Sequence, residues 1–215
     1  MNEEASVAAY QAYFTRPVAD VVSDLEQYAT LLRKWQKVQN LVSRETLSDV
    51  WLRHFADSLQ VLPLTKEKDQ NFLDLGSGGG FPALPLAIAR QGSGQTFTLV
   101  EPTGRKASFL RTVARELDLS VSVENRRAEQ IDSRETPVPD VITSRALASL
   151  PALCSWMYPF FAPHTRAILH KGVEHVEELA ETIPLWDMDV LTTPSNTDSR
   201  GVLLTLTNLR SKTTR

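Results

Sequence analysis

The sequence predicts an α/β protein built on a mostly parallel sheet with helices on both faces. From residue 71 onward, short apolar runs alternate with amphipathic helical segments, and repeated strand–helix units of this kind build parallel sheets. A glycine-rich stretch follows the first apolar run directly, as it does at nucleotide-binding turns. The last two apolar runs have only a polar loop between them, which predicts an antiparallel pair of strands at one edge.

Residues 1–65 precede the first strand, and we expect them to form a helical cap. Apolar side chains recur at three- and four-residue steps between Val18 and Trp35, which is the pattern of an amphipathic helix. Pro17 stands at its start, where proline is tolerated. A shorter helix is expected before it and another after it, which Pro63 ends. The expected cap helices are residues 5–14, 17–39 and 46–62.

Residues 66–215 are expected to form one compact α/β unit on which the cap packs. Since the carboxyl ends of parallel strands share one rim, the segments that follow the strands should converge there. The expected strands are residues 71–75, 96–101, 120–124, 138–144, 165–170, 188–193 and 201–209. The expected helices of this unit are residues 81–90, 103–117, 149–158 and 174–182. The converging segments are Gly76–Phe81, Glu101, Arg127–Glu129, Ser144–Ala146 and Lys171–Gly172.

The stretch from Asn71 to Phe81 reads NFLDLGSGGGF and carries four glycines in five residues. Glycine suits a tight turn and lets the backbone approach a ligand, although a tight turn without a ligand is the plain alternative. No Gly-Lys-Ser/Thr follows the glycines, which excludes a phosphate-binding P-loop. In a dinucleotide fingerprint the third small residue would fall on Phe81, which would crowd the helix against the strand.

Two carboxylates lie beside the glycines, and the first of them favours S-adenosylmethionine over NAD as the ligand. Asp74 lies two residues before the first glycine, where it would repel a pyrophosphate and attract the sulfonium and ammonium of S-adenosylmethionine. Glu101 ends the second strand, where an acid can hold the two ribose hydroxyls. NAD would use the same acid, and an acid that complements the next helix dipole is a further alternative for Glu101. Asp74 is therefore the residue that separates the two cofactors.

Composition narrows the class of protein further. The 215 residues are 42% hydrophobic, and no apolar run reaches the roughly 18–20 residues that a membrane helix needs. The acidic N-terminal stretch lacks the layout of a signal peptide, so we expect a cytoplasmic protein. The single cysteine, Cys154, rules out an internal disulfide and a cysteine-based zinc site. The histidines are scattered, and we expect no metal.

Charge is unevenly distributed along the chain, whose net charge is −3. Residues 31–54 are rich in Lys and Arg, whereas residues 1–30 and 174–189 are acidic. A local basic strip on an acidic protein suits a partner that presents phosphate. An ordinary solvated surface is the alternative.

Two cations, Arg145 and Lys171, directly follow strands at the expected rim. A salt bridge to a carboxylate is the structural alternative, for Arg145 to Asp74 or Glu129. The functional interpretation is contact with the cofactor, a phosphate or a guanine edge, which the planar guanidinium fork suits.

The expected rim carries no pair of carboxylates for general acid–base catalysis and no nucleophile elbow. Methyl transfer to a ring nitrogen that already has a lone pair needs no base, only alignment and exclusion of water. The turn at Ser144–Leu147 lacks the Asn/Asp-Pro-Pro-aromatic pattern typical of transfer to an exocyclic amine. Cys154 lies beyond that turn, in a helix, which disfavours a cysteine nucleophile acting on cytosine C5.

Together these segments resemble the RsmG family, also called GidB, of bacterial 16S rRNA guanine-N7 methyltransferases. The glycine loop alone would indicate only the methyltransferase class. The combination of RHxxDSL upstream with SRA after the fourth strand is specific to this family, whereas the end of the chain matches weakly. The matching segments are Trp35 with Asn40-Leu41, Arg53-His54 with Asp57-Ser58-Leu59, Asp74 through Pro82, Phe109-Leu110, Arg127-Ala128-Glu129, Ser144-Arg145-Ala146 and Lys171-Gly172.

The resemblance implies a class I S-adenosylmethionine-dependent methyltransferase fold, which is Rossmann-like with a seven-stranded sheet in the order 3-2-1-4-5-7-6. It implies transfer of a methyl group from S-adenosylmethionine to N7 of one guanine in 16S rRNA, with the rRNA or the small ribosomal subunit as partner. Members of the family often have Gly at the position of Ala83 and Asp at the position of Glu101. Glutamate keeps the carboxylate, so this departure concerns only fine geometry.

The resemblance also implies roles for residues that match its motifs. Asp74 and the glycine backbone would receive the methionine end of the cofactor, Glu101 the ribose, and Ala128 and Glu129 the adenine, while Arg145 would close the pocket. No residue is expected to be an obligatory catalytic group, and Arg145 and Lys171 are the positioning candidates. The expected cofactor-binding residues are Asp74, Gly76, Ser77, Gly78, Gly80, Phe81, Glu101, Ala128, Glu129 and Arg145. The expected RNA-binding residues are Arg33, Lys34, Lys37, Arg53, His54, Arg127 and Lys171.

Three other functions compete with this hypothesis. A methyltransferase acting on a small molecule or protein would show no salt-dependent RNA binding. A non-enzymatic sensor would bind an adenosine ligand without turnover. A dehydrogenase is disfavoured by Asp74 and Phe81. We expect a monomer, and the sequence leaves open whether naked rRNA or the assembled subunit is the substrate.

Overall fold

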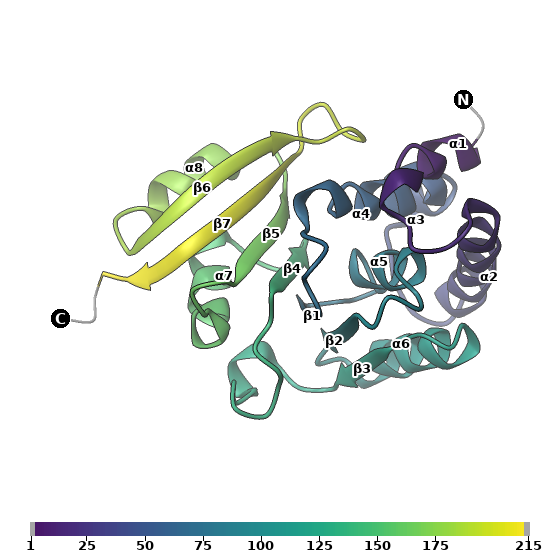
Figure 1. Ribbon diagram of the computed structural model, residues 1–215, viewed down its shortest axis with the longest axis horizontal. Coiled ribbons are helices and arrows are strands. Elements are labelled where there is room, and N and C mark those ends of the chain that lie inside the picture. Colours follow the sequence, from purple (N-terminus) through teal and green to yellow (C-terminus); the bar gives the residue numbers. More distant parts are fainter. Residues whose placement is uncertain (1–2, 213–215) are drawn as a thin grey trace.

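The computed structural model describes residues 3–212 and contains one mixed sheet between two layers of helices (Figure 1). The strands are β1 (Asn71–Leu75), β2 (Thr96–Val100), β3 (Val121–Glu124), β4 (Val141–Arg145), β5 (Arg166–Lys171), β6 (Trp186–Pro194) and β7 (Val202–Ser211). The seven strands lie in the order β3-β2-β1-β4-β5-β7-β6. Strands β1 to β5 pair in parallel, and β7 runs antiparallel between β5 and β6. This confirms the predicted sheet, including its antiparallel edge.

The helices form a separate layer on each face of the sheet. They are α1 (Glu3–Ala8), α2 (Val18–Gln36), α3 (Arg44–Leu47), α4 (Asp57–Leu59), α5 (Ala83–Ala89), α6 (Gly104–Glu116), α7 (Leu150–Met157) and α8 (His175–Thr182). Short 3₁₀ turns lie at Gln11–Tyr13, Leu62–Leu64, Ala128–Gln130 and Tyr158–Phe160. Among residues 3–212, no helix is both long and apolar enough to cross a membrane.

Each face of the sheet has its own hydrophobic core. Successive strand side chains point to opposite faces, so Phe72 and Leu73 of β1 belong to different clusters. Helices α1, α2, α4, α5 and α6 bury side chains with Phe72, whereas α7 and α8 pack on the face of Leu73. Helices α1 to α6 therefore form the layer on the Phe72 face, and α7 and α8 form the layer on the Leu73 face.

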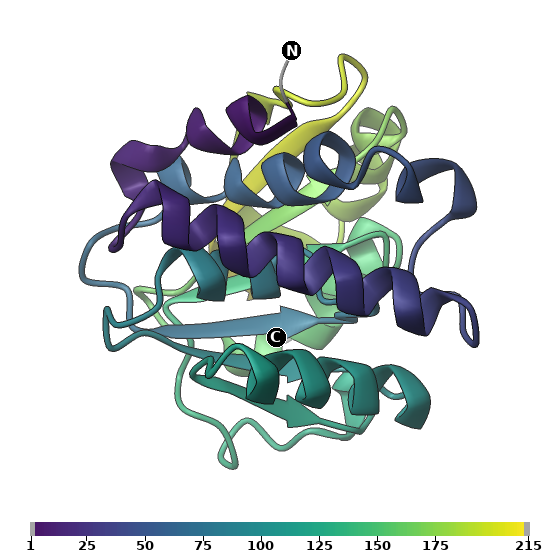
Figure 2. The ribbon, with the colours of Figure 1, turned by 90° about the vertical axis from the view of Figure 1, so that its right-hand side faces the viewer.

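The cap packs directly on the glycine-rich loop. Figure 2 shows α2 lying across the layer that contains α5 and α6. Tyr28 of α2 is fully buried, its ring stacks on Phe81 with centroids 5.4 Å apart, and its hydroxyl donates a hydrogen bond to the carbonyl oxygen of Gly79. Because cap side chains and those of α5 and α6 form one cluster, a boundary at residue 65 stays a prediction.

The prediction of one regular helix over residues 46–62 is wrong. Helix α3 ends at Leu47, and a π-helical turn at Trp51–Ala56, labelled η2, then leads into α4. A π turn holds one residue more than an α-helical turn and is frequent at functional sites. Here it turns His54 and Phe55 into the protein, where both are buried.

The fourth strand begins three residues later than predicted, at Val141 instead of residue 138. Pro139 has no N–H to donate to the ladder, and Val138 is 51% exposed. At its other end the strand continues to Arg145, whose backbone pairs with His170 of β5. Arg145 therefore projects from the rigid sheet and not from a free loop.

Candidate functional site

A cavity of about 1010 Å³ opens at the carboxyl ends of β1, β2, β4 and β5. This is the rim on which ligands lie in open α/β sheets. One wall is the glycine-rich loop, and the other combines the cap with the loop between β6 and β7. The lining residues are Asn40–Arg44, Thr46, Arg53, His54, Asp57, Gly76–Gly79, Phe81, Glu101, Pro102, Lys106, Arg145–Leu147, His170–Gly172, Ser195, Asp198, Gly201 and Val202.

The glycine-rich loop turns tightly over the end of β1. The backbone N–H groups of Gly76 and Ser77 donate to the carbonyl oxygen of Val100, at 2.9 and 3.0 Å. Gly80 has a φ of +97°, and a Cβ there would lie 2.7 Å from the hydroxyl of Tyr28 and 2.8 Å from Cγ of Leu84. Glycine is therefore required at Gly80 by both the backbone conformation and the packing of the cap.

Asp74 lies beneath this loop, where only 1% of it is exposed. Its Oδ1 accepts a hydrogen bond of 2.6 Å from the Thr143 hydroxyl, and its Oδ2 is buried with no hydrogen-bond partner in the described residues. Burial raises the pKa of Asp74 to about 7, and the neighbouring Glu101 carboxylate adds to the increase. An unpaired buried carboxylate oxygen is costly, so this site is suited to a ligand that brings a positively charged donor.

Glu101 joins the loop to the next helix. Its Oε2 accepts the Gly78 N–H at 2.9 Å and its Oε1 accepts the Thr103 N–H at 2.8 Å. Since Thr103 precedes the first residue of α6, the helix-acid interpretation of Glu101 has support. Its carboxylate also lines the cavity, and an ionised carboxylate can accept up to about four hydrogen bonds.

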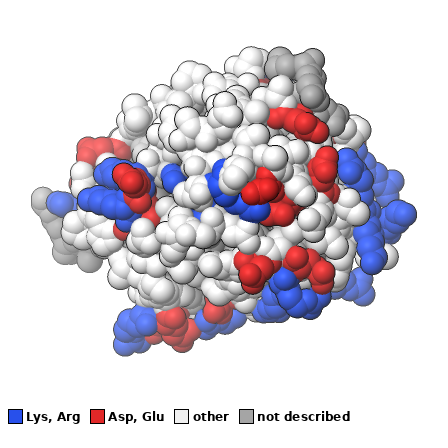
Figure 3. All heavy atoms as spheres, turned by 45° about the vertical axis from the view of Figure 1, so that its right-hand side comes forward, with Lys and Arg blue, Asp and Glu red and all other residues white. Residues whose placement is uncertain are grey.

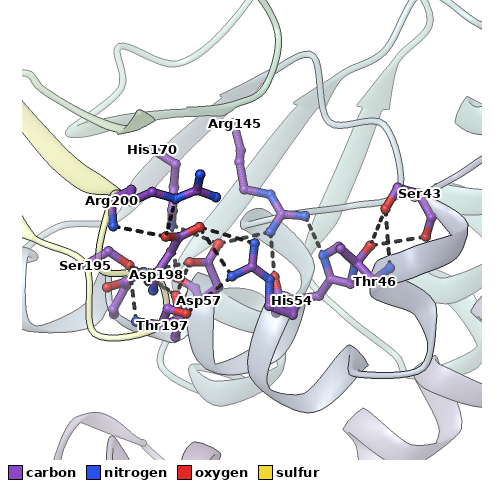
Figure 4. A network of polar contacts seen from close by, with 12 residues as sticks. Ser43, Thr46, His54, Asp57, Arg145, His170, Ser195, Thr197, Asp198 and Arg200 are labelled. Atoms are coloured by element: carbon purple, nitrogen blue, oxygen red, sulfur yellow. Dashed lines mark hydrogen bonds and ion pairs between the residues drawn. The ribbon is translucent and has the colours of Figure 1, made fainter. Parts of the chain in front are cut away.

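Arg145 stands at the opposite wall, at the centre of a polar network (Figure 4). One guanidinium nitrogen, Nη1, donates to Oδ2 of Asp57 at 3.0 Å and to the carbonyl oxygen of Arg53 at 3.2 Å. The other, Nη2, lies 2.8 Å from Nδ1 of His54. The guanidinium also lies over the Phe81 ring, 4.9 Å from its centroid. A salt bridge from Arg145 to a carboxylate is therefore present, but the partner is Asp57 of the cap and not Asp74 or Glu129, which the sequence suggested as examples.

Asp57 ties this network to the C-terminal hairpin. Its Oδ1 accepts hydrogen bonds from the Thr197 hydroxyl at 2.5 Å and from Nε2 of Gln60 at 2.8 Å. Burial acts to raise the pKa of Asp57, but His170, Arg145 and the Thr197 hydroxyl outweigh it and hold that pKa below its ordinary value. Asp57 is therefore ionised at neutral pH and compensates the charge of Arg145.

The two histidines of the network are neutral at pH 7. Burial and the charge of Arg145 lower the pKa of His54 to about 3, and burial lowers the pKa of His170. The His54 ring stacks on Phe81 at 4.7 Å, and its Nε2 lies 2.9 Å from the Thr46 hydroxyl. Nε2 of His170 lies 2.9 Å from the carbonyl oxygen of Asp57. Both rings thus position neighbouring groups and carry no positive charge.

Lys171 and Arg53, two of the expected RNA-binding residues, are engaged within the protein. The Lys171 ammonium forms a 2.5 Å ion pair with Glu178, and its side chain is 7% exposed. The guanidinium of Arg53 forms an ion pair of 3.3 Å with Asp198 in the β6–β7 loop. Both residues line the cavity, but each has its charge compensated by a carboxylate.

The remaining predicted residues lie beside the cavity or outside it. Ala128 is buried and Glu129 exposed in the 3₁₀ turn after β3, and neither is among the lining residues. The cations Arg33, Lys34, Lys37 and Arg127 are exposed on the surface. Leu147 covers Gly76 so closely that a Cβ there would lie 2.7 Å from its Cδ2.

Four residues of the network had no predicted role: Asp57, His170, Thr197 and Asp198. Asp57 belongs to the RHxxDSL segment, so the sequence identified its motif, but it did not indicate that Arg145 would be its partner. Residues 195–198 lie in a loop of Ser, Asn, Thr and Asp, a composition typical of any polar turn. In the described part of the chain, no three His, Cys, Asp or Glu side chains are grouped so that they could hold a metal ion.

The sequence matches the family model of GidB, described as rRNA small subunit methyltransferase G, over residues 21–200. The chain belongs to the GidB family. A relative from Cereibacter sphaeroides is 42% identical over 184 residues, covering 85% of this chain and 88% of the relative. One from Brucella ovis is 42% identical over 188 residues, covering 86% and 87%. Both are named ribosomal RNA small subunit methyltransferase G, and the family predicted from the motifs is confirmed.

Solved structures similar to this GidB-family chain share its fold at low sequence identity. An O-methyltransferase from Bacillus cereus in complex with SAH has a TM-score of 0.59 and 17% identity, covering 86% of this chain and 91% of that one. A ribosomal protein L11 methylase from Lactobacillus delbrueckii subsp. bulgaricus has a TM-score of 0.53 and 14% identity, covering 72% and 78%. With the strand order, these likenesses confirm the predicted class I methyltransferase fold.

Proposed function

We propose that this chain transfers a methyl group from S-adenosylmethionine to N7 of a guanine in 16S rRNA. The observation that carries the proposal is the family membership, because relatives that match most of the chain are named as methyltransferases of small-subunit rRNA. The structure supports it through a cavity lined by a glycine cradle, Glu101 and a compensated arginine on one rim, with Asp74 buried beneath the glycine loop. Because its substrate would be ribosomal, we propose that the protein acts in the cytoplasm. We also propose that it acts as a monomer.

The donors and acceptors of the glycine wall fit S-adenosylmethionine. The free Oδ2 of Asp74 would accept a hydrogen bond from a cofactor ammonium, whose charge would offset the cost of burying the carboxylate. Glu101 would accept the ribose hydroxyls with its remaining lone pairs, and we propose that Ala128 and Glu129 flank the adenine. When bound, the cofactor supplies a methyl group on a positively charged sulfur.

The residues of the other wall would hold the acceptor base and exclude water. Guanine N7 already has a lone pair in the ring plane, so no side chain has to remove a proton. Positioning of two reactants can contribute about 7–11 kcal/mol. We propose that Arg145 and Phe81 align the base, and that Lys171 positions the turn after β4 through its bond of 2.9 Å to the carbonyl oxygen of Ala148.

Asp57 would also control the electrostatics of the transfer. The cofactor brings a positive charge into the cavity, and that charge moves to the guanine ring when N7 becomes methylated. An uncompensated Arg145 would repel the charge throughout the reaction. Nη1 of Arg145 lies 3.0 Å from Oδ2 of Asp57, so the negative charge of Asp57 offsets the positive charge of Arg145. Arg145 can then donate hydrogen bonds in the cavity while the pair adds little net charge to it.

The test uses labelled S-adenosylmethionine, the purified protein and 30S subunits from a strain that lacks this methyltransferase. RNA is then cleaved chemically at 7-methylguanosine. One strong new cut in 16S rRNA is the expected result, and parallel reactions with protein-free 16S rRNA decide between naked and assembled substrate. Cofactor binding with no cut in either RNA would contradict the proposal and favour a small molecule or protein as the substrate.

A further inference from the structure

Six cations gather beside the mouth of the cavity, and we call them the basic strip. They come from the end of α2, from α3 and from the start of α6. Two of them line the cavity itself, and the others lead away from it over the surface. The residues of the basic strip are Arg33, Lys34, Lys37, Arg44, Arg105 and Lys106.

The two helices bring their cations together at the rim of the sheet. Figure 2 shows that α2 ends where α6 begins, on the side to which the parallel strands point. The rings of Trp35 and Phe109 lie 5.7 Å apart between the helices, and Nε2 of Gln39 donates to the carbonyl oxygen of Arg105 at 3.3 Å. Arg44 and Lys106 continue the strip to the cavity mouth. The strip is therefore one surface and not two.

Among residues 3–212, the cations of the basic strip have no carboxylate partner. None of the six forms an ion pair with any of the described residues, whereas Arg126, Arg134 and Arg145 elsewhere in the protein all do. All except Lys106 are exposed. Figure 3 shows Lys and Arg side chains gathered along its right-hand edge, on the side of α2 and α6. On a chain of net charge −3, this arrangement creates a local positive potential.

The helix dipole explains the cations at the end of α2 but not those at the start of α6. Cations at the carboxyl end of α2 complement its helix dipole, as Arg33 and Lys34 do. Arg105 and Lys106 stand in the first turn of α6, where the dipole disfavours cations; that turn itself contains no acid, and Glu101 lies just before it. Those two cations oppose the stability of their own helix, so their position requires another explanation.

We propose that the basic strip binds the phosphate backbone of the rRNA that flanks the target guanine. This rests on the proposed function, and it adds Arg105 and Lys106 of α6 to the basic residues between 31 and 54 that the sequence already associates with RNA. Contacts to phosphate fix the register of an RNA without reading its bases. The strip would therefore hold the RNA next to the cavity, while the cavity selects the guanine.

Two variants test the strip, with a third as a matched control. The first, called the α2 variant, removes the charges of Arg33 and Lys34 at the end of α2 and of Lys37 directly after it (R33Q/K34Q/K37Q). The second removes one charge from α6 (R105Q). The control, K66Q/K68Q, removes two exposed charges from the loop before β1, at the opposite end of the strands. Binding to fluorescently labelled, unmethylated 16S rRNA is measured between 50 and 300 mM salt, and thermal unfolding confirms that each variant is folded.

Each phosphate contact that is lost should lower the slope of log affinity against log salt by about 0.7–0.9. We expect this decrease for R105Q, two to three times this decrease for the α2 variant, and wild-type behaviour for the control. An unrelated RNA of equal length should show the same changes, because the contacts are to phosphate. Wild-type binding by a folded R105Q would overturn the extension of the strip to α6, and equal losses in the control would overturn the strip altogether.

Failure of the strip and failure of the proposed function are distinguishable. If wild-type protein methylates 16S rRNA while both strip variants bind it normally, the strip proposal is wrong and the proposed function stands. If wild-type protein binds rRNA through the strip but produces no cut at 7-methylguanosine, the strip stands and the reaction is wrong. If wild-type protein binds neither protein-free 16S rRNA nor 30S subunits, both are wrong.

Discussion

The two walls of the cavity are built in different ways. The glycine wall is mostly backbone from one continuous stretch, residues 76–81, with Asp74 and Glu101 behind or beside it. The network wall, centred on Arg145, is made of side chains from four segments that are remote in sequence. The first depends on the absence of side-chain atoms, and the second depends on compensated charge. The two walls should therefore fail in different ways when they are altered.

The largest effect is expected at the glycine wall, for Gly80→Ala. The new Cβ would meet Tyr28 and Leu84 at a backbone φ of +97°, so we expect a loss of about 3 kcal/mol or more in the free energy of unfolding. Cofactor binding should be lost with it. Urea unfolding and calorimetric titration with S-adenosylmethionine measure the two losses.

Gly92→Ala is the matched control for this substitution. Gly92 has a φ of +82° but no atom within 4 Å of the added Cβ. Gly92→Ala should therefore lower the free energy of unfolding only through the strained backbone conformation, by roughly 1–2 kcal/mol. Equal losses at the two positions would show that contact with the cap does not decide the need for glycine in the loop.

At the network wall the largest effect is expected for Asp57→Asn. The amide keeps the shape but leaves the charge of Arg145 uncompensated beside a cationic cofactor. We expect turnover to fall on the order of 100-fold and stability to fall by about 2 kcal/mol. Because the defect is electrostatic, part of the activity should return as salt is raised.

The control for Asp57→Asn is Asp132→Asn, which removes a carboxylate from an exposed pair. Arg134 in that pair is 88% exposed, and exposed pairs contribute about 0–1 kcal/mol. Turnover should be unchanged in this control. If Asp57→Asn were as harmless as the control, Arg145 would need no compensation and the network would be structural only.

Asp74→Asn tests the glycine wall through the pH dependence of protein stability. The pKa of Asp74 is about 7 in the folded protein, against about 3.9 for an ordinary aspartate. Between these values the folded state holds a proton that the unfolded state has lost, so wild-type stability falls as pH rises from about 4 to 7. Relative to wild type, the variant should gain about 1 kcal/mol or more between pH 4 and 8.

Cofactor binding should respond to Asp74 in the opposite direction. Wild-type affinity for S-adenosylmethionine should rise as pH increases through about 7, because the ionised carboxylate receives the ammonium. The variant should bind roughly tenfold or more weakly, as for loss of a charged hydrogen bond, and without this pH dependence. A parallel pH dependence in both proteins would assign the titration to another group.

The smallest effect is expected for Thr197→Val, in the hairpin loop. It removes the 2.5 Å hydrogen bond to Asp57 but leaves the bond from Gln60 to the same oxygen. We expect a loss of about 1 kcal/mol and a fall of a few-fold in kcat/KM. Thr192→Val, at an exposed position of β6, is the control. A loss as large as that of Asp57→Asn would mean that the loop, and not the charge pair, holds Arg145.

The difference between the glycine wall and the network wall also explains which parts of the site could be predicted from the sequence. The glycine wall was predictable because strand, turn chemistry and acid all lie within one short window around Asp74 and Gly80. Its second acid, Glu101, follows from the regular spacing of strand–helix units. The sheet order and the family came from motifs, and both are confirmed.

The network wall was not predictable from local patterns. Arg145 was identified, but its partner is fixed by packing of the cap against the ends of β4 and β5, which no window of sequence contains. The π turn that orients His54 toward Phe81 has the composition of an ordinary helix. Thr197 and Asp198 belong to a loop whose polar composition is common to many turns. These contacts are tertiary, and only the folded chain brings them together.

The position of β7 has a consequence for the making of the protein. This strand is the last in the chain, yet it lies inside the sheet, between β5 and β6. During translation, residues 202–211 leave the ribosome after every strand with which they pair. Until then the nascent chain has an unpaired edge at β5, and the loop that carries Thr197 is not anchored. The parallel half of the sheet can form early, but the network wall is completed only once β7 has been synthesised and has entered the sheet.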